Sequence, residues 1–361
     1  MNVTHRIILV VFIILFLFTC KKTPTDSGPV AVTFPDANFE TLIREALDQP
    51  TGDILNTDLL TITELDGNDR EIVDISGIEH CLYLENLYLQ KNSISDISAL
   101  SGLIKLKKLY LYNNFVIIDI NVLSNLINLE QLFLSNNLIT DITPITGLNN
   151  LITLLIGGNP LDDIGAISNL TQLQALYLGN CHIGNINALS NLTNLKLLEL
   201  NDTQITDIAI LSGLTDLETL WVCNNNLSEI HTLASLTKLK FLHLANTNTV
   251  SISDLTGLIN LTSLFIFNNQ IVDIGPLSEL VNLTNVNMWG NQIVNISPLS
   301  GLTNLESVNI NQNSVTDISP LVDNSGIDDG DEIWLENNPL SDTSINTYIS
   351  QLEARGVTVY W

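Results

Sequence analysis

The sequence predicts an α/β solenoid in which each repeat contributes one short strand to a continuous parallel sheet. An apolar pattern opens at Ile62 and occurs twelve times up to residue 329, with a spacing of 22 residues in all but two units. If the first residue of a unit is offset zero, the thirteenth offset is isoleucine in all twelve units. Apolar residues at the third and fifth offsets alternate with the period of a strand. These observations favour one solenoid over several separate domains.

The composition excludes several classes of protein. Of the 361 residues, 45% are hydrophobic and 14% are charged, which excludes a disordered chain. Thirteen Lys and Arg residues against 39 Asp and Glu residues give a net charge of −26, so we expect no nucleic-acid partner. The four cysteines show no metal-binding spacing, so we expect neither a metal nor another cofactor. Cys81, Cys181 and Cys223 fall in separate units and are expected to be free thiols.

Residues 1–19 are predicted to form a signal peptide. His5 and Arg6 precede an apolar run over residues 7–18. A helix that spans a bilayer needs roughly 20 apolar residues, so this run is too short to serve as one. We therefore expect the chain to leave the cytoplasm.

The apolar run ends at Cys20, in a Leu-Phe-Thr-Cys sequence that resembles the lipobox of bacterial lipoproteins. This resemblance implies that Cys20 is acylated and anchors the protein to a membrane, at the cell surface or the periplasmic face. Phe18 and Thr19 depart from the small residues usual in a lipobox, so an ordinary cleaved signal peptide stays open as an alternative. Residues 20–33 are polar and rich in Pro, Gly and Ser, which predicts a tether. The expected contact with the membrane is through this lipid anchor alone.

Residues 34–61 are predicted to form a helical N-terminal cap that covers the open end of the solenoid. Pro35 and Asp36 precede a run of apolar residues at helical spacing, and Pro50 and Gly52 close it. The apolar face comprises Phe39, Leu42, Ile43, Ala46 and Leu47.

Residues 62–329 form the twelve repeats. Aspartate is frequent at the twelfth offset, as at Asp96, where it precedes an Ile-x-x-Leu turn and is placed to accept a backbone N–H as an N-cap does. The unit from Leu239 departs most from the pattern, with Thr247, Thr249 and Ser251 where Asn, Ile and Asp are expected. We expect a local irregularity there.

The pattern LxxLxLxxNxIxDIxxLxxLxx resembles the leucine-rich repeats of the internalin type found on bacterial surface proteins, and it covers about three quarters of the chain. The resemblance implies an α/β leucine-rich repeat solenoid shaped as a right-handed horseshoe. Its concave face would carry the parallel β-sheet, its convex face short 3-10 or irregular turns, and its N-terminus a helical cap. The resemblance also implies that asparagine at the eighth offset bonds neighbouring backbone inside the coil. The matching residues are Asn92, Asn114, Asn137, Asn159, Asn225, Asn269, Asn291 and Asn313.

Four units carry another residue at the eighth offset. Cys181, Thr203 and Thr247 are small enough to take the place of asparagine inside the coil. Arg70 is expected to point to solvent instead.

Residues 330–361 are predicted to form a partial repeat and a C-terminal cap. Apolar residues at helical spacing predict a helix near residues 343–354, and a short apolar strand is expected at residues 357–361. Their burial would cover the second open end of the stack.

The candidate ligand-binding residues are aromatic side chains at the second, fourth and sixth offsets. Residues at these offsets point away from the core and line the concave face. Packing of the core does not require aromatic residues there, and an exposed aromatic patch is typical of a recognition surface. Glu199, Asn201 and Asp202 separate two predicted clusters. The first comprises Tyr88, Tyr110, Tyr112, Phe133 and Tyr177, and the second Trp221, Phe241, His243, Phe265, Phe267 and Trp289.

The sequence favours a binding protein over an enzyme. His80, His182, His231 and His243 fall in different units without a partner at a recurring offset, so we identify no catalytic residues and expect no enzyme activity. A rigid aromatic surface favours a protein ligand, in protein–protein interaction or adhesion. The resemblance implies a host or bacterial surface protein as that ligand.

Two alternative functions stay open. A row of aromatic rings can stack on the sugars of a carbohydrate or a cell-wall polymer. The protein could also be a structural envelope component whose aromatic residues only stiffen the sheet.

Overall fold

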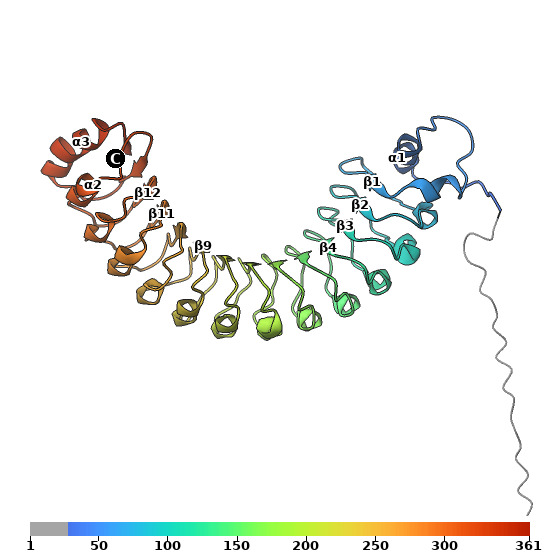
Figure 1. Cartoon of the computed structure of the whole chain (residues 1–361), viewed down its shortest axis with the longest axis horizontal. Coiled ribbons are helices and arrows are strands. Elements are labelled where there is room, and N and C mark those ends of the chain that lie inside the picture. The colour runs from blue at the N-terminus through green and yellow to red at the C-terminus, as the bar shows by residue number, and fades with distance from the viewer. Residues whose placement is uncertain (1–27) are drawn as a thin grey trace, which may run out of the picture.

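The computed structural model describes residues 28–361, so the predicted signal peptide, Cys20 and the first part of the tether lie outside the described residues. The chain forms an open arc, with the strands on its inner side and helical turns on its outer side (Figure 1). This arrangement confirms the predicted solenoid with its sheet on the concave face. Within residues 28–361, no helix is both long enough and apolar enough to cross a membrane.

The strands of residues 28–361 form one sheet of 14 parallel strands that follow the order of the chain. The register is constant, because equivalent offsets of successive units pair with each other, as Leu87 does with Leu109. In each strand from β2 to β12 the middle residue is buried and its two neighbours are half-buried. The strands are β1 (Glu64–Asp66), β2 (Asn86–Tyr88), β3 (Lys108–Tyr110), β4 (Gln131–Phe133), β5 (Thr153–Leu155), β6 (Ala175–Tyr177), β7 (Leu197–Glu199), β8 (Thr219–Trp221), β9 (Phe241–His243), β10 (Ser263–Phe265), β11 (Asn285–Asn287), β12 (Ser307–Asn309), β13 (Glu332–Trp334) and β14 (Thr358–Tyr360).

Short 3-10 turns form the convex side of the repeats. All eight aspartates at the twelfth offset accept the backbone N–H two residues further on, as Asp96 does from Ser98 at 2.8 Å, which confirms the predicted bond to a backbone N–H. The N-cap position itself is held by a following residue, as it is by Ile97 in that unit. Asn185 and Asn295 make the same contact in two other units. The turns are η2 (Asp58–Thr61), η3 (Ile78–His80), η4 (Ser98–Gly102), η5 (Asn121–Asn125), η6 (Thr143–Ile145), η7 (Gly165–Ile167), η8 (Asn187–Asn191), η9 (Ala209–Gly213), η10 (His231–Ser235), η11 (Ser253–Leu255), η12 (Gly275–Glu279) and η13 (Ser297–Leu299).

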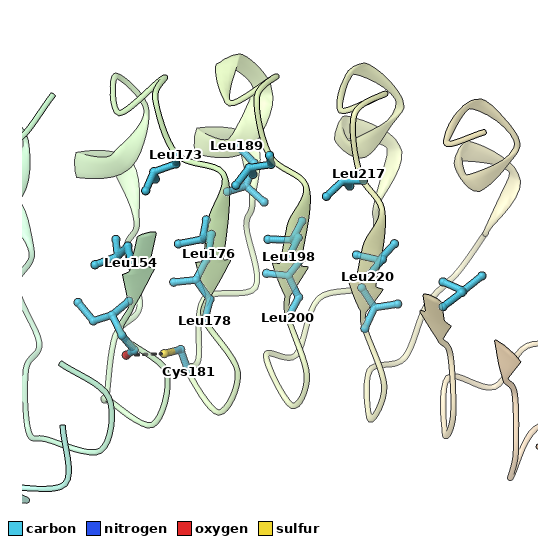
Figure 2. Close-up of a cluster of buried hydrophobic side chains, with 14 of the residues drawn as sticks. Leu154, Leu173, Leu176, Leu178, Cys181, Leu189, Leu198, Leu200, Leu217 and Leu220 are labelled. Carbon is cyan, nitrogen blue, oxygen red and sulfur yellow. Dashed lines mark hydrogen bonds between the residues drawn. The ribbon is translucent and has the colours of Figure 1, made fainter. Parts of the chain in front are cut away.

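The core is a continuous stack of leucine and isoleucine side chains between the strands and the convex turns. Figure 2 shows equivalent leucines of successive units aligned along the stack, with Leu176 and Leu198 on neighbouring strands. Both residues have no exposed surface. Each unit therefore buries its apolar face against the next unit.

The predicted asparagine ladder lies inside the coil. The side-chain amide of Asn269 donates to the carbonyl oxygens of Leu244 at 2.9 Å and Ile266 at 3.0 Å, and its oxygen accepts the N–H of Thr249 at 3.0 Å. One side chain thus bonds backbone of its own unit and of the preceding one. The contacts satisfy buried peptide groups in a turn that no strand partner reaches.

The three small substitutes keep part of the bonding of the ladder: Cys181 reaches the preceding unit, and the two threonines bond a carbonyl of their own unit. Thr203 and Thr247 each donate their hydroxyl to a carbonyl oxygen at 2.7 Å, and the Cys181 thiol lies 3.8 Å from the carbonyl oxygen of Ile156 (Figure 2). The expectation of an irregularity in the unit from Leu239 is wrong. Its strand β9 keeps the register of its neighbours, and the Thr247 hydroxyl supplies the bond within the unit that asparagine makes elsewhere.

A second asparagine ladder, which was not predicted, lies on the exposed surface. Its asparagines stand at the ends of their units, shortly before the next strand. Asn282, for example, donates its amide to the carbonyl oxygen of Ile259 in the preceding unit at 2.8 Å. The other members of this ladder are Asn128, Asn150, Asn194, Asn260 and Asn304.

At the N-terminal end, α1 (Ala37–Leu47) covers the first repeat. Asp36 caps this helix by accepting the N–H groups of Asn38 and Phe39, and its second oxygen accepts the N–H of Val73 at 2.7 Å. One carboxylate thus both starts the helix and docks it on the repeats. Arg70 points outward as expected and pairs with Glu45 of α1 at 2.6 Å.

At the C-terminal end, two short helical segments and a last strand follow β13. These are a π-helical turn, η14 (Ser344–Tyr348), and the helix α3 (Ile349–Glu353), which precede β14. The helix α2 (Ser319–Asp323) replaces the 3-10 turn of the last unit. Buried Ile349 and Leu352 pack against the end of the core.

Candidate functional site

The constant register of the sheet aligns the fourth-offset residues in one column on the concave face. Each of these residues ends its strand and points away from the buried middle residue, as Tyr110 does beside Leu109. All eleven aromatic and histidine residues predicted for the site are half-buried. They pack side by side along the sheet yet keep part of each ring accessible.

Three of the five residues of the first cluster form a short group of rings in contact. Tyr88 meets Tyr110 edge to face at 4.9 Å between ring centroids, and Tyr110 stacks on Phe133 at 4.0 Å. The Tyr110 hydroxyl donates to the side-chain oxygen of Gln131. Burial, with the nearby acids Glu64 and Asp66, raises the pKa of Tyr88, so its hydroxyl stays a neutral donor at physiological pH.

The second cluster is a continuous chain of ring contacts across β8 to β11. Its ring centroids are 5.1 to 6.0 Å apart, and all pairs are tilted rather than stacked. The contacts run through Trp221, Phe241, Phe265, His243, Phe267 and Trp289. Tilted rings leave edges and parts of faces open to a ligand.

The predicted boundary between the two clusters is wrong. The Tyr177 ring lies 6.4 Å from the Trp221 ring, so Tyr177 belongs to the second cluster although it precedes Glu199 in sequence. Leu155 occupies the column between Phe133 and Tyr177, and the row of rings breaks there. The rings lean toward each other over the intervening strand, which linear spacing could not show. We call the resulting row of Tyr177 and the six residues of the second cluster the long aromatic row.

Tyr112 lies beside the first cluster without a ring contact of its own. It is half-buried and follows β3 at the sixth offset. Its backbone oxygen accepts the N–H of Lys91, which continues the sheet-like bonding beyond the strands.

Glu199 is a carboxylate within the long aromatic row. The Asn201 amide donates to Glu199 Oε1 at 3.1 Å, and the Cys223 N–H donates to Asn201 Oδ1 at 2.9 Å, which orients the amide. A Cβ at Gly179 would lie 2.7 Å from Glu199 Oε1, so the carboxylate rests close against the backbone of Gly179 and would have to shift if a side chain were present there. Burial, with the nearby Asp202 charge, raises the pKa of Glu199 against the opposing bond from Asn201.

His243 packs between aromatic rings rather than in a polar site. Its ring lies 5.5 Å from Phe265 and 5.4 Å from Phe267, and its Nε2 is buried without a hydrogen-bond partner among the described residues. Burial lowers its pKa, so the imidazole is neutral at physiological pH and contributes a flat, largely apolar contact.

The described cysteines are buried and unpaired, as expected. Burial raises the pKa of Cys81 to about 12 and, with the charges of Asp202 and Glu199, that of Cys223 to about 11. Protonated thiols of this kind are poor nucleophiles and metal ligands. Residues 28–361 contain no group of three or more His, Cys, Asp or Glu side chains placed to hold a metal ion.

The ion pairs of the described chain lie away from the long aromatic row. One lies within the N-terminal cap, one joins the cap to the first repeat, and three join successive units, as Lys107 does with Glu85 at 2.7 Å. None of the five reaches a residue of the row, so Glu199 has no cationic partner within residues 28–361.

Comparison with known proteins places these features in a family. A family model described as leucine-rich repeats (2 copies) matches residues 83–125, 104–150, 193–235, 237–279, 259–299 and 281–323, which together exceed half of the chain. No curated protein matches the sequence.

Solved structures show the same fold. An internalin (inlF) from Listeria monocytogenes is 32% identical, with a TM-score of 0.73 over 91% of this chain and 88% of its own. A leucine-rich repeat protein of Leptospira interrogans is 22% identical, with a TM-score of 0.73 over 79% of this chain and 74% of its own. The functional domain of InlJ from Listeria monocytogenes is 20% identical, with a TM-score of 0.57 over 85% of this chain and 82% of its own.

Proposed function

The chain belongs to the leucine-rich repeat family as an internalin-like member, and from this premise we propose that it binds a protein partner on its concave face. The observation that carries the proposal is the long aromatic row, which runs unbroken from Tyr177 to Trp289. Aromatic side chains supply large contact area with few rotatable bonds, and they dominate the energy of many protein interfaces.

The rigidity of the sheet supports the same proposal. Every strand is paired on both sides from β2 to β13, so the concave residues need little ordering when a partner binds. The middle residue of each of these strands is buried, which leaves the flanking side chains free to contact a ligand.

For the location, we propose an extracytoplasmic lipoprotein anchored through Cys20, at the cell surface or the periplasmic face. The sequence of residues 1–33 supports this assignment, and so does the similarity to an internalin. Such a placement would present the arc to proteins of a host or of another bacterial surface.

Binding of a carbohydrate or cell-wall polymer is the alternative that the tyrosines of the first cluster favour. Tyr88 and Tyr110 bring hydroxyl groups next to ring surfaces, as sugar-binding sites do. The stacking of Tyr110 on Phe133 argues against it, because each ring covers one face of the other.

The test is a parallel screen of protein and glycan arrays with the chain from residue 20 onward, carrying Cys20→Ser to remove the lipid. We expect a protein ligand whose capture is lost in the Trp221→Ala variant. Capture of a glycan alone would favour the carbohydrate alternative. Binding that Trp221→Ala and Phe265→Ala leave unchanged would overturn the assignment to the concave face, and absence of any ligand would favour a structural role.

A further inference from the structure

Glu199 is an anomaly in an otherwise uncharged row of rings. The register places it directly between Tyr177 on β6 and Trp221 on β8. It is half-buried, and it accepts one hydrogen bond, on Oε1, within residues 28–361. Partial burial of a carboxylate without a cation is unfavourable, so a cation that reached this group would be stabilised by it.

The surrounding residues hold this carboxylate in place rather than exclude it. Glycine at position 179 gives Oε1 its room, since a Cβ there would approach to 2.7 Å. Asn201 bonds Oε1 and is itself fixed by the Cys223 N–H. Oε2 accepts no hydrogen bond from any described residue, so one oxygen stays available to a ligand.

We propose that Tyr177, Glu199 and Trp221 form a subsite for a basic side chain of the protein partner, arginine in preference to lysine. This inference rests on the proposed protein-binding function and assigns the chemistry of one contact within it. A guanidinium can bond the carboxylate and lie over an aromatic ring at the same time. The ammonium of lysine is a compact, strongly hydrated charge and gains less from the rings.

Charge complementarity points to the same partner. The chain has 39 acidic against 13 basic residues, and five of the basic residues in the described part are already in ion pairs. At the second, fourth and sixth offsets of the strands, Lys108 is the one cation of the described repeats, and it lies on β3, four strands from Glu199. The partner surface that faces the row must therefore supply the positive charge.

The experiment uses the Cys20→Ser chain from residue 20, labelled with 5-fluorotryptophan, and 19F NMR. The four tryptophans of the sequence give four resonances, and Trp221→Phe assigns one of them. The probes are N-acetylarginine amide, N-acetyllysine amide, the uncharged N-acetylcitrulline amide, and choline. The variant is Glu199→Gln, and the matched control is Glu64→Gln, because Glu64 is also a concave carboxylate bonded by an asparagine amide but pairs across the sheet with Asn86 rather than with an aromatic residue.

We expect the arginine probe to shift the Trp221 resonance in a saturable way. The affinity of the citrulline probe should be at least about fivefold lower. Glu199→Gln should lower the affinity for the arginine probe by about the same factor, and Glu64→Gln should leave that affinity unchanged. Equal binding of citrulline, or binding unaffected by Glu199→Gln, would overturn the subsite. Tighter binding of choline than of arginine would overturn the assignment to a protein side chain.

The outcome separates this inference from the proposed function. If Trp221→Ala abolishes capture of a protein ligand while Glu199→Gln leaves the arginine probe unaffected, the interface stands and the basic subsite falls. If the probe binds through Glu199 but the arrays yield no protein ligand, the proposed function fails while the cation site itself stands.

Discussion

The ring centroids of Tyr177 and Trp221 lie 6.4 Å apart although the strand that carries Glu199 runs between their own strands. Equivalent atoms two strands apart in a sheet are separated by about 9.6 Å. The two rings therefore lean toward each other across the intervening strand. This contact extends the long aromatic row across the strand that carries Glu199.

Truncation of the row should weaken ligand binding without unfolding the protein. Trp221→Ala or Phe265→Ala should each cost roughly 2 kcal/mol or more of binding free energy, as central aromatic anchors do. The melting temperature should change little, because both rings point away from the core. Trp334→Ala is the control, since Trp334 shares the column but stacks on Tyr360 beyond the row. Loss of stability with unchanged affinity would identify the rings as stiffeners of the sheet.

Glu199→Gln should stabilise the protein at neutral pH. Folding raises the pKa of this carboxyl, so above the ordinary value of 4.5 ionisation is less favourable in the folded state than in the unfolded one, and this difference lowers stability. Below the ordinary value of 4.5 the carboxyl is protonated in both states, so that cost disappears. The melting temperature of the variant should exceed that of the wild type near pH 7 and match it near pH 4. An equal difference at both pH values would mean that ionisation is not the cause.

Asp36→Ala should destabilise the N-terminal cap by about 1 kcal/mol or more, because a cap and a docking contact are lost together. Burial alone would raise the pKa of Asp36, but the N–H groups of Val73, Phe39, Asp74 and Asn38 outweigh it and lower the pKa. The stabilisation is therefore present above the ordinary value of 3.8 and is lost as pH falls through the lower folded-state pKa.

Thermal scans of Asp36→Ala and of the wild type, at neutral pH and as the pH falls below 3.8, measure both the loss of stability and its pH dependence. The variant should lose less stability on acidification than the wild type does. Glu45→Gln breaks the exposed pair with Arg70 and should cost at most about 1 kcal/mol, which makes it the control. A similar loss in the two variants would contradict a special role for Asp36.

Asn269→Leu should lower the free energy of unfolding by about 1–3 kcal/mol, because it leaves buried backbone groups unpaired. Asn260→Leu in the outer ladder should cost less, since water can replace its bond to the exposed carbonyl of Thr237. Denaturant unfolding of both variants makes the comparison. A neutral Asn269→Leu would show that its buried hydrogen bonds contribute nothing net to stability.

Cys20 should carry lipid in the mature protein. Mass spectrometry of the N-terminus should find an acylated cysteine, and Cys20→Ser should move the protein out of the membrane fraction. An unmodified N-terminus downstream of Cys20 would show that the signal is simply removed.

The sequence by itself determined the architecture. A period of 22 residues with isoleucine at one offset leaves a single way to bury the apolar residues, which is to stack identical units. The resemblance to internalin-type repeats implied that Asn269 lies in the interior. The period placed the twelfth-offset aspartates at the starts of the turns, because each offset meets the same surroundings in every unit. The concave column of aromatic residues followed from the alternation of strand side chains.

Only the tertiary structure showed which side chains make contacts between one unit and another. Tyr177 reaches Trp221 because rings extend farther than a strand spacing. Asp36 meets Val73 across 37 residues of sequence, which no periodicity encodes. A repeat pattern specifies the environment of each offset, but the conformations of long side chains depend on which residues the neighbouring units happen to carry.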